Sequence, residues 1–548
     1  MSYLHSSVMS SKAFDVILFG ATGFTGKLVA KHIHDLNVDF KWAIAGRSQQ
    51  KLSALISELV DMRAPKNLPD VLIADVNDPK SMADICGEAK IVLNCTGPFR
   101  FLGKEVVEAC LKAKCTYMDI CGEPQFMEQC FLDYHDLAVQ NNVLILHACA
   151  FDSVPADMGV LYTMRQYESM RCSSIESFLT ISSPRGLKGH YTTYECAVHG
   201  LGDLAKLKEI REEVKKKYKL PALQHTGKKL SKVSTYKFEE RLGKYVIPSL
   251  SSDSAVVRTS HRALAMRTGQ LQWPQHTACI TIHDFYTVAT TSLYGSMFYT
   301  LTGSPWGRSM LLSNPELFSA GIFTKTGPSR EQLENTSFQM HFFAKGSPSS
   351  IKNNDDNDGD DVDGDEGDVE NFEDNGESLK TKAARGEATL LPSQVSGTNT
   401  VSKACSFGRF FNGKKTNPAT VLTDTSRDRD VHVIVSGPEP GYVATPAIFF
   451  ALVQCVLEER EILPCGGVLT PSAAFHDSPS VFARLANAGL LFAVHSDSEL
   501  TSRIKEEEES KMGENEAIVG IAVGSGEERI HKTENTHLGE RITQGSKS

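Results

Sequence analysis

A glycine-rich turn directly after a short apolar run constrains this chain more than any other feature. The run is Phe14 to Phe19, and helical spacing continues from Lys27 to Leu36. A strand, a tight turn and a helix in this order are typical of a dinucleotide-binding unit, in which glycines let the backbone approach a pyrophosphate at the helix N-terminus. A purely structural turn is the alternative. The residues that we expect to bind the dinucleotide here are Gly20, Thr22, Gly23, Phe24, Thr25 and Gly26.

Further apolar runs alternate with helical stretches after this turn. They are Trp42 to Ala45, Val71 to Ala74, Ile91 to Asn94, Thr116 to Asp119 and Val143 to Leu146. Strands that alternate with helices indicate an α/β fold with a doubly wound, parallel, Rossmann-type sheet.

The pattern changes after Pro155 to longer segments, such as Ile175 to Ile181 and Ser337 to Phe343, which predict a second α/β domain with a mixed or antiparallel sheet. A strand near Phe338 to Phe343 should pair with another at His432 to Val435. The predicted organisation is an N-terminal extension (1–13), a Rossmann domain (14–155), a second domain for substrate or oligomerisation (156–345), a disordered acidic insertion (346–429), a return to both domains (430–495) and a disordered tail (496–548).

Charge and cysteine usage limit the partners. Residues 355–377 hold thirteen Asp or Glu, and without them the formal net charge of −10 becomes +3, so we expect no nucleic-acid partner. The thirteen cysteines form no C-x-x-C pair and no regularly spaced Cys/His set, so we expect no metal. The start of the chain lacks a secretory signal, and the apolar stretch Tyr442 to Val456 is too short to span a bilayer and should be a buried helix. We expect a cytoplasmic, non-secreted protein.

The end of the second strand selects the cofactor. An NAD enzyme places Asp or Glu there for the ribose 2′-hydroxyl, whereas this chain has Arg47 and Ser48, which favour the 2′-phosphate of NADP(H) over NAD(H). A solvated surface arginine is the alternative. Later strand ends add Asp75 on the adenine side, and Thr96, Gly97 and Pro98 near the ribose and pyrophosphate, unless these residues only turn the chain.

Seven motifs occur in an order that resembles the saccharopine dehydrogenase-like oxidoreductases. They are GATGFTG, AGRS, NCTGPFR, YMDICGEPQF, AFDSVPADMGV, GPEPGYVATP and GGVLTPSAAF. The resemblance implies a Rossmann domain, a second α/β domain and oxidoreductase activity. It also implies association with lipid droplets or membranes, and a relation to trans-acting enoyl reductases. Because no Arg or Lys cluster suits two carboxylates, a lipid substrate is favoured over an amino acid.

Three residues are candidates for proton transfer beside a nicotinamide: Asp152, His190 and Tyr191. The alternatives are ordinary capping chemistry after Asp152 and a surface loop at His190. An aromatic-rich segment, Phe285 to Phe323, is compatible either with reversible docking on a lipid surface or with a buried homodimer interface. Two functions remain: an NADP(H)-dependent oxidoreductase on a lipid-like carbonyl or enoyl substrate, and a non-catalytic nucleotide-binding scaffold at a lipid surface.

Overall fold

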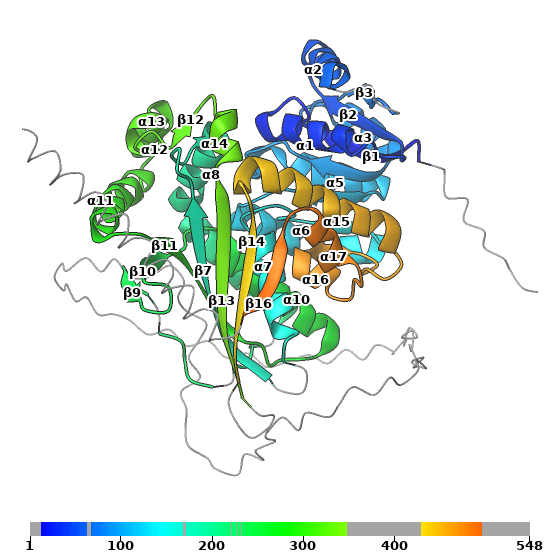
Figure 1. Cartoon of the computed structure of the whole chain (residues 1–548). Helices are drawn as coiled ribbons and strands as arrows, with labels where there is room; N and C mark the ends of the chain where they lie inside the picture. Colours follow the sequence, from blue (N-terminus) through cyan, green and yellow to red (C-terminus); the bar gives the residue numbers. More distant parts are fainter. Residues whose placement is uncertain are drawn as a thin grey trace, which may run out of the picture. The chain divides into compact units, whose positions relative to one another are not determined.

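Two seven-stranded sheets form the framework of the protein (Figure 1). The computed structural model describes residues 12–62, 67–167, 171–220, 222–225, 227–231, 233–347 and 429–495. The predicted acidic insertion and both predicted terminal segments lie outside the described residues, apart from residues 12, 13, 346, 347 and 429.

The first sheet is entirely parallel, with the strand order β15-β6-β5-β4-β1-β2-β3. This order confirms the predicted Rossmann-type sheet, because the chain winds outward in both directions from β1 and β4. Its strands are β1 (Phe14–Phe19), β2 (Trp42–Gly46), β3 (Asp70–Ile73), β4 (Ala89–Asn94), β5 (Thr116–Asp119), β6 (Leu144–Leu146) and β15 (Gly467–Leu469).

Helices cover both faces of this sheet, so its strands are apolar on both sides. In β1, Val16 and Leu18 pack into one core cluster, and Ile17 and Phe19 pack into another. The first cluster includes α1 (Phe24–Asp35), α2 (Gln49–Met62), α7 (Val154–Met164) and α15 (Thr445–Glu459). The second includes α3 (Pro79–Glu88), α5 (Lys104–Ala113), α6 (Pro124–Asn141) and α9 (Leu204–Tyr218), and the short α4 (Phe99–Leu102) contributes Phe99.

The second sheet is mixed, as predicted, with the order β16-β14-β13-β7-β11-β10-β9. Only β7 and β11 pair in parallel. β13 and β14 form the predicted antiparallel pair, with Met340 opposite Val435. The strands are β7 (Arg171–Ser182), β9 (Lys237–Glu239), β10 (Lys244–Pro248), β11 (Gln275–Ile282), β13 (Ser337–Ser347), β14 (Arg429–Pro438) and β16 (Leu491–His495).

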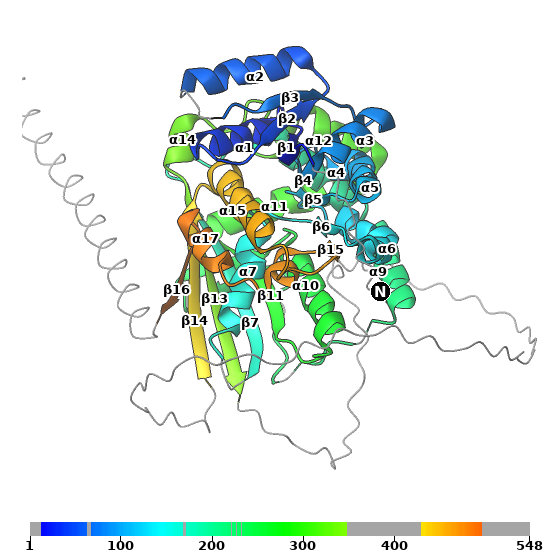
Figure 2. The same cartoon turned by 90° about the vertical axis from the view of Figure 1, so that its right-hand side faces the viewer.

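The core continues from one sheet to the other, because α7 and α15 lie between them (Figure 2). The η1 π-helix (Pro440–Ala444) and α15 together form the one helix in the described residues that is long and apolar enough to cross a membrane. It extends beyond the predicted stretch Tyr442 to Val456 at both ends, so the prediction that it is too short was wrong. The prediction that it is a buried helix is confirmed, because 72% of its apolar window is buried. The remaining elements are β8 (Gly189–His190), α8 (Tyr191–Gly202), α10 (Asp253–Thr268), α11 (Phe285–Thr302), α12 (Pro305–Ser313), α13 (Pro315–Phe318), β12 (Phe323–Thr324), α14 (Arg330–Glu334), α16 (Pro471–Phe475) and α17 (Val481–Asn487).

Candidate active site

The glycine turn has no room for side chains at two of its three glycines. Gly20 has a φ of +80°, and a Cβ on Gly26 would stand 2.2 Å from the Gly20 carbonyl oxygen. Helix α1 starts directly after Gly23, and no side chain caps its first backbone N–H groups. Exposed N–H groups at a helix N-terminus attract anions, so the turn fits a pyrophosphate.

Thr96, at the end of β4, lies against this turn. Its backbone N–H donates to Asn94 Oδ1 at 2.9 Å, while its buried hydroxyl has no hydrogen-bond partner among the described residues. A Cβ on Gly20 would stand 2.5 Å from Thr96 Oγ1, so the two residues touch. A buried hydroxyl without a partner is costly, and a nucleotide oxygen at this position would supply one. The predicted residues Gly20 and Thr96 therefore form one cradle that fits the cofactor.

Arg47, Ser48 and Asp75 follow the ends of β2 and β3. Arg47 is exposed and forms no ion pair with the described part of the chain, and a Cβ on Gly46 would lie 3.8 Å from Thr22 Oγ1. Gly46, the residue before Arg47, thus lies beside the glycine turn. Ser48 Oγ accepts a bond from Lys51 N at 3.4 Å at the start of α2. Asp75 accepts from the backbone and side chain of Asn77, both at 3.0 Å, so its carboxylate supports the turn into α3.

Helix α8 lies over the ends of β4 and β5. A Cβ on Gly97, which precedes Pro98, would meet Thr192 Cγ2 at 3.8 Å. Farther along α8, Cys196 Sγ donates to Glu123 Oε1 at 3.4 Å. Glu123 also forms a buried ion pair with Arg100 at 2.5 Å. These contacts hold α8 across the edge formed by the carboxyl ends of the strands, where ligands bind in open α/β sheets.

A network of hydrogen bonds around Asp119 holds the loops at this edge of the sheet. Asp119 Oδ1 accepts from the backbone N–H groups of Cys121 and Ala148, at 3.1 and 3.0 Å. Its Oδ2 accepts from Tyr117 at 2.9 Å and lies 2.7 Å from His147 Nδ1. The carboxylate therefore ties the loop after β5 to the loop after β6.

Phe24 and His190 are brought together although 165 positions separate them in the sequence. Their rings stack with centroids 4.5 Å apart, and Tyr442 meets the edge of Phe24 at 4.9 Å. The His190 backbone N–H donates to the Tyr442 hydroxyl at 2.6 Å. His190 Nδ1 accepts from Thr192 N at 3.3 Å, and burial lowers the pKa of the ring. Tyr442 was missed as a site residue, since its only signal was its place in GPEPGYVATP.

Asp152 lies in the loop after β6 with a φ of +94°. A Cβ on Gly122, in the loop after β5, would stand 3.1 Å from its Oδ2, and Ser252 Oγ donates to the same oxygen at 3.3 Å. Burial raises the pKa of Asp152. Burial and the charge of Asp152 raise that of Asp253, whose Oδ1 has no partner within the described ranges. Nothing in the sequence indicated this pair, because 100 positions separate its members.

Tyr191 begins α8, next to His190. Its ring is half-buried, and burial followed by the charge of Glu195 raises the pKa of its hydroxyl. The hydroxyl therefore stays protonated at neutral pH.

Comparison with known proteins places this geometry in a family. Residues 16–146 match the family model described as Saccharopine dehydrogenase NADP binding domain. A rat protein named Saccharopine dehydrogenase-like oxidoreductase is 31% identical over 500 residues, which cover 89% of this chain and 99% of that protein. The chain belongs to the saccharopine dehydrogenase-like oxidoreductases. The predicted resemblance is confirmed, and the chain is an oxidoreductase with an NADP-binding domain, as the sequence predicted.

Two further relatives carry other names, one for a lipid-droplet location and one for an enoyl reductase. The Lipid droplet localized protein of Caenorhabditis elegans is 24% identical over 89% of this chain and 99% of its own length. The Putative trans-acting enoyl reductase Rv2449c of Mycobacterium tuberculosis is 38% identical over 149 residues, which cover 27% of this chain and 35% of that protein.

Proposed function

We propose that this protein transfers hydride between NADP(H) and a lipid-like carbonyl or enoyl substrate, and that it takes this substrate from a lipid surface. The observation that carries the proposal is the position of α8. One part of this helix contacts Gly97 and Glu123 at the cofactor edge, and another part packs against the apolar helices α11 and α12.

Tyr194 contributes to the contact with α11 and α12. Its ring meets Phe298 of α11 with centroids 5.5 Å apart, and its hydroxyl donates to the Leu311 carbonyl of α12 at 3.4 Å. Leu311 and Phe318 are buried in the same cluster, and Phe298 packs against it. These three apolar residues of the segment therefore contribute to packing and not to a surface contact. Helices α11 and α12 therefore pack against α8, and α8 in turn contacts the edge where we place the cofactor.

The outer side of this segment remains apolar and exposed. We name it the α11 surface, and its exposed members are Phe285, Tyr286, Leu293, Tyr294, Met297, Tyr299, Trp306 and Leu317. Aromatic rings favour a water–lipid boundary, and exposed apolar clusters mark lipid or protein contacts. The name of the worm relative supports a lipid surface, and the name of the mycobacterial relative supports an enoyl substrate. A homodimer that buries the α11 surface is the alternative.

Within this proposal Asp152 supplies or accepts the proton. NADPH contributes a hydride when it is bound, and reduction of a carbonyl or enoyl group also consumes one proton. Burial keeps the carboxyl of Asp152 protonated at higher pH than usual, which suits a proton donor. Tyr191 can donate a hydrogen bond to the substrate oxygen. His190 is a positioning residue, because Thr192 N occupies its Nδ1 and its ring stacks on Phe24.

The test is a search for lipids that consume NADPH. Purified protein is mixed with lipid fractions in mixed micelles, and cofactor oxidation and lipid masses are followed together. A lipid class that gains two mass units only with active protein would support the proposal. Nucleotide binding without turnover on any lipid class would instead favour the second candidate, a non-catalytic nucleotide-binding scaffold at a lipid surface.

A further inference from the structure

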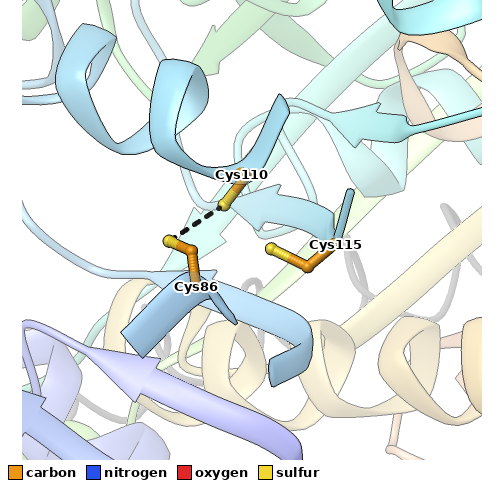
Figure 3. A group of neighbouring side chains, drawn as sticks. All are labelled: Cys86, Cys110 and Cys115. Atoms are coloured by element: carbon orange, nitrogen blue, oxygen red, sulfur yellow. Dashed lines mark hydrogen bonds between the residues drawn. The ribbon is translucent and has the colours of Figure 1, made fainter. Parts of the chain in front are cut away.

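Three buried thiols meet at one point beside the first sheet. Cys86 lies in the last turn of α3, Cys110 lies in the last turn of α5, and Cys115 precedes β5. All three Sγ atoms lie within 4.8 Å of one another, and those of Cys86 and Cys110 are 3.7 Å apart (Figure 3). The spacing of these cysteines along the chain does not indicate a metal site, and only the packing of α3 against α5 brings them together.

We propose that Cys86, Cys110 and Cys115 bind one thiophilic metal ion, of the class of monovalent copper, through three thiolates. Metal–thiolate bonds of about 2.3 Å place sulfur atoms roughly 4.0 Å apart in a trigonal site. The sulfur atoms of the trio are already at such separations, so binding needs only small side-chain rotations. The metal replaces the thiol protons, which leave to solvent, and no electron is transferred.

The donor set selects the ion. Sulfur is the only ligand type in the group, and soft thiolates select soft ions. A structural zinc ion takes four ligands, whereas the described residues provide three, and all three thiols are buried away from bulk water. Copper in its monovalent state accepts three sulfur ligands.

Lys12 offsets part of the negative charge that three thiolates bring. Its ammonium donates to the Ala113 carbonyl at 2.9 Å and to the Cys86 carbonyl at 3.3 Å. The ammonium is therefore held where α3 and α5 end, beside the trio. Without such a cation the carbonyl ends of two helices would oppose a negatively charged complex.

The site is separate from the proposed active site. Cys115 lies immediately before the first residue of β5, while the cofactor cradle follows the last residues of β1 and β4. In a parallel sheet these are opposite edges. Metal binding should consequently stabilise the packing of α3 and α5 on the first sheet without entering the hydride-transfer step.

The experiment titrates the full-length, reduced protein with Cu(I) under anaerobic conditions against a Cu(I)-chelating dye. We expect one ion per chain and three sulfur ligands in X-ray absorption spectra. Cys115→Ala should weaken binding at least tenfold and lower the sulfur count. Cys130→Ala, which removes another buried thiol of the same domain, and Cys465→Ala, which removes an exposed one, should bind as the wild type does. NADPH titration of every variant reports whether the fold is intact.

Three results would overturn the proposal. The first is equal copper affinity of Cys115→Ala and the wild type. The second is zinc uptake by the trio without copper uptake. The third is a Cys86–Cys110 disulfide in protein isolated without reductant, combined with no metal uptake after reduction.

Discussion

The imidazole of His190 stacks on the ring of Phe24, with the planes within 16° of parallel. Phe24 is the first residue of α1, and His190 directly precedes α8, so the stack joins the glycine turn to the helix that lies over the ends of β4 and β5. Tyr442 completes the contact through its bond from His190 N. Nucleotide that orders the turn would therefore also fix the start of α8.

Arg47 should set the preference for NADP(H). Arg47→Ala should weaken NADPH binding by about 1.5–3 kcal/mol, the contribution of a charge-assisted hydrogen bond, and leave NADH binding nearly unchanged. Lys51→Ala, which removes another exposed cation nearby, is the matched control. Calorimetric titration measures both nucleotides. An equal loss for the two would show that Arg47 does not contact the 2′-phosphate.

Gly26→Ala should abolish nucleotide binding, because the new Cβ would stand 2.2 Å from the Gly20 carbonyl oxygen and force the turn apart. Gly295→Ala in α11 meets nothing within 4 Å and should raise stability by roughly 0.5–1 kcal/mol, as expected in a helix interior. Fluorescence titration with NADPH and thermal unfolding separate the two effects. Wild-type affinity in Gly26→Ala would contradict the assigned geometry.

Asp152→Asn should remove turnover and leave NADPH affinity intact. Because the proton donor must be protonated, the wild-type rate of reduction should fall as the pH rises through the Asp152 pKa, which burial places above its ordinary value. Asp133→Asn, on the exposed side of α6, should keep the wild-type pH profile. Steady-state rates across pH 4–9 test this, and an active Asp152→Asn variant would exclude the assigned role.

Asp157 should make the fold more stable in mild acid. It is buried, it accepts bonds from Ser260 and Ser472, and burial raises its pKa from 3.8 to about 6. Between these values the unfolded chain releases the proton while the folded chain keeps it. Proton binding to Asp157 thus adds roughly 3 kcal/mol to the free energy of unfolding below pH 3.8, and this contribution is lost by about pH 6. Denaturant unfolding of the wild type and Asp157→Asn should show this slope only in the wild type.

The α11 surface should hold the protein on lipid. Replacing Tyr286, Leu293 and Trp306 by Ser removes exposed apolar area without touching the packed residue Phe298, so most protein should leave the lipid layer in a flotation assay. The control replaces Leu137, Val139 and Ile462, which are exposed outside this surface, by Ser. Equal flotation of both triple variants would contradict lipid docking. A wild-type dimer that the first triple variant converts to monomers would favour the subunit interface.

Local signals account for much of what could be predicted. β1 and β5 begin and end at the expected residues, because an apolar run bounded by glycine or a polar residue marks a buried strand clearly. The stripe Leu207, Ile210 and Val214 faces the core, as helical spacing requires. The prediction that the cysteines bind no metal rested on their spacing along the sequence alone. The predicted site residues are still to be tested by mutation.

Contacts between distant segments could not be predicted. Asp253 meets Asp152 only because α10 packs against α7, and Tyr442 reaches His190 only after η1 returns to α1. The sequence left open whether the segment Phe285 to Phe323 is exposed or buried, and in the structure Phe298 packs against Tyr194. Each of these depends on how whole elements pack, which periodicity along one element does not encode.

β13 and β14 stay paired as far as Gly346 opposite Arg429. The chain therefore leaves the second sheet and re-enters it at neighbouring positions, with 82 residues between these two partners. Closure entropy rises only with the logarithm of loop length. The length of the sequence between these two partners is therefore only weakly coupled to the stability of the sheet, so shortening it should leave β13 and β14 paired.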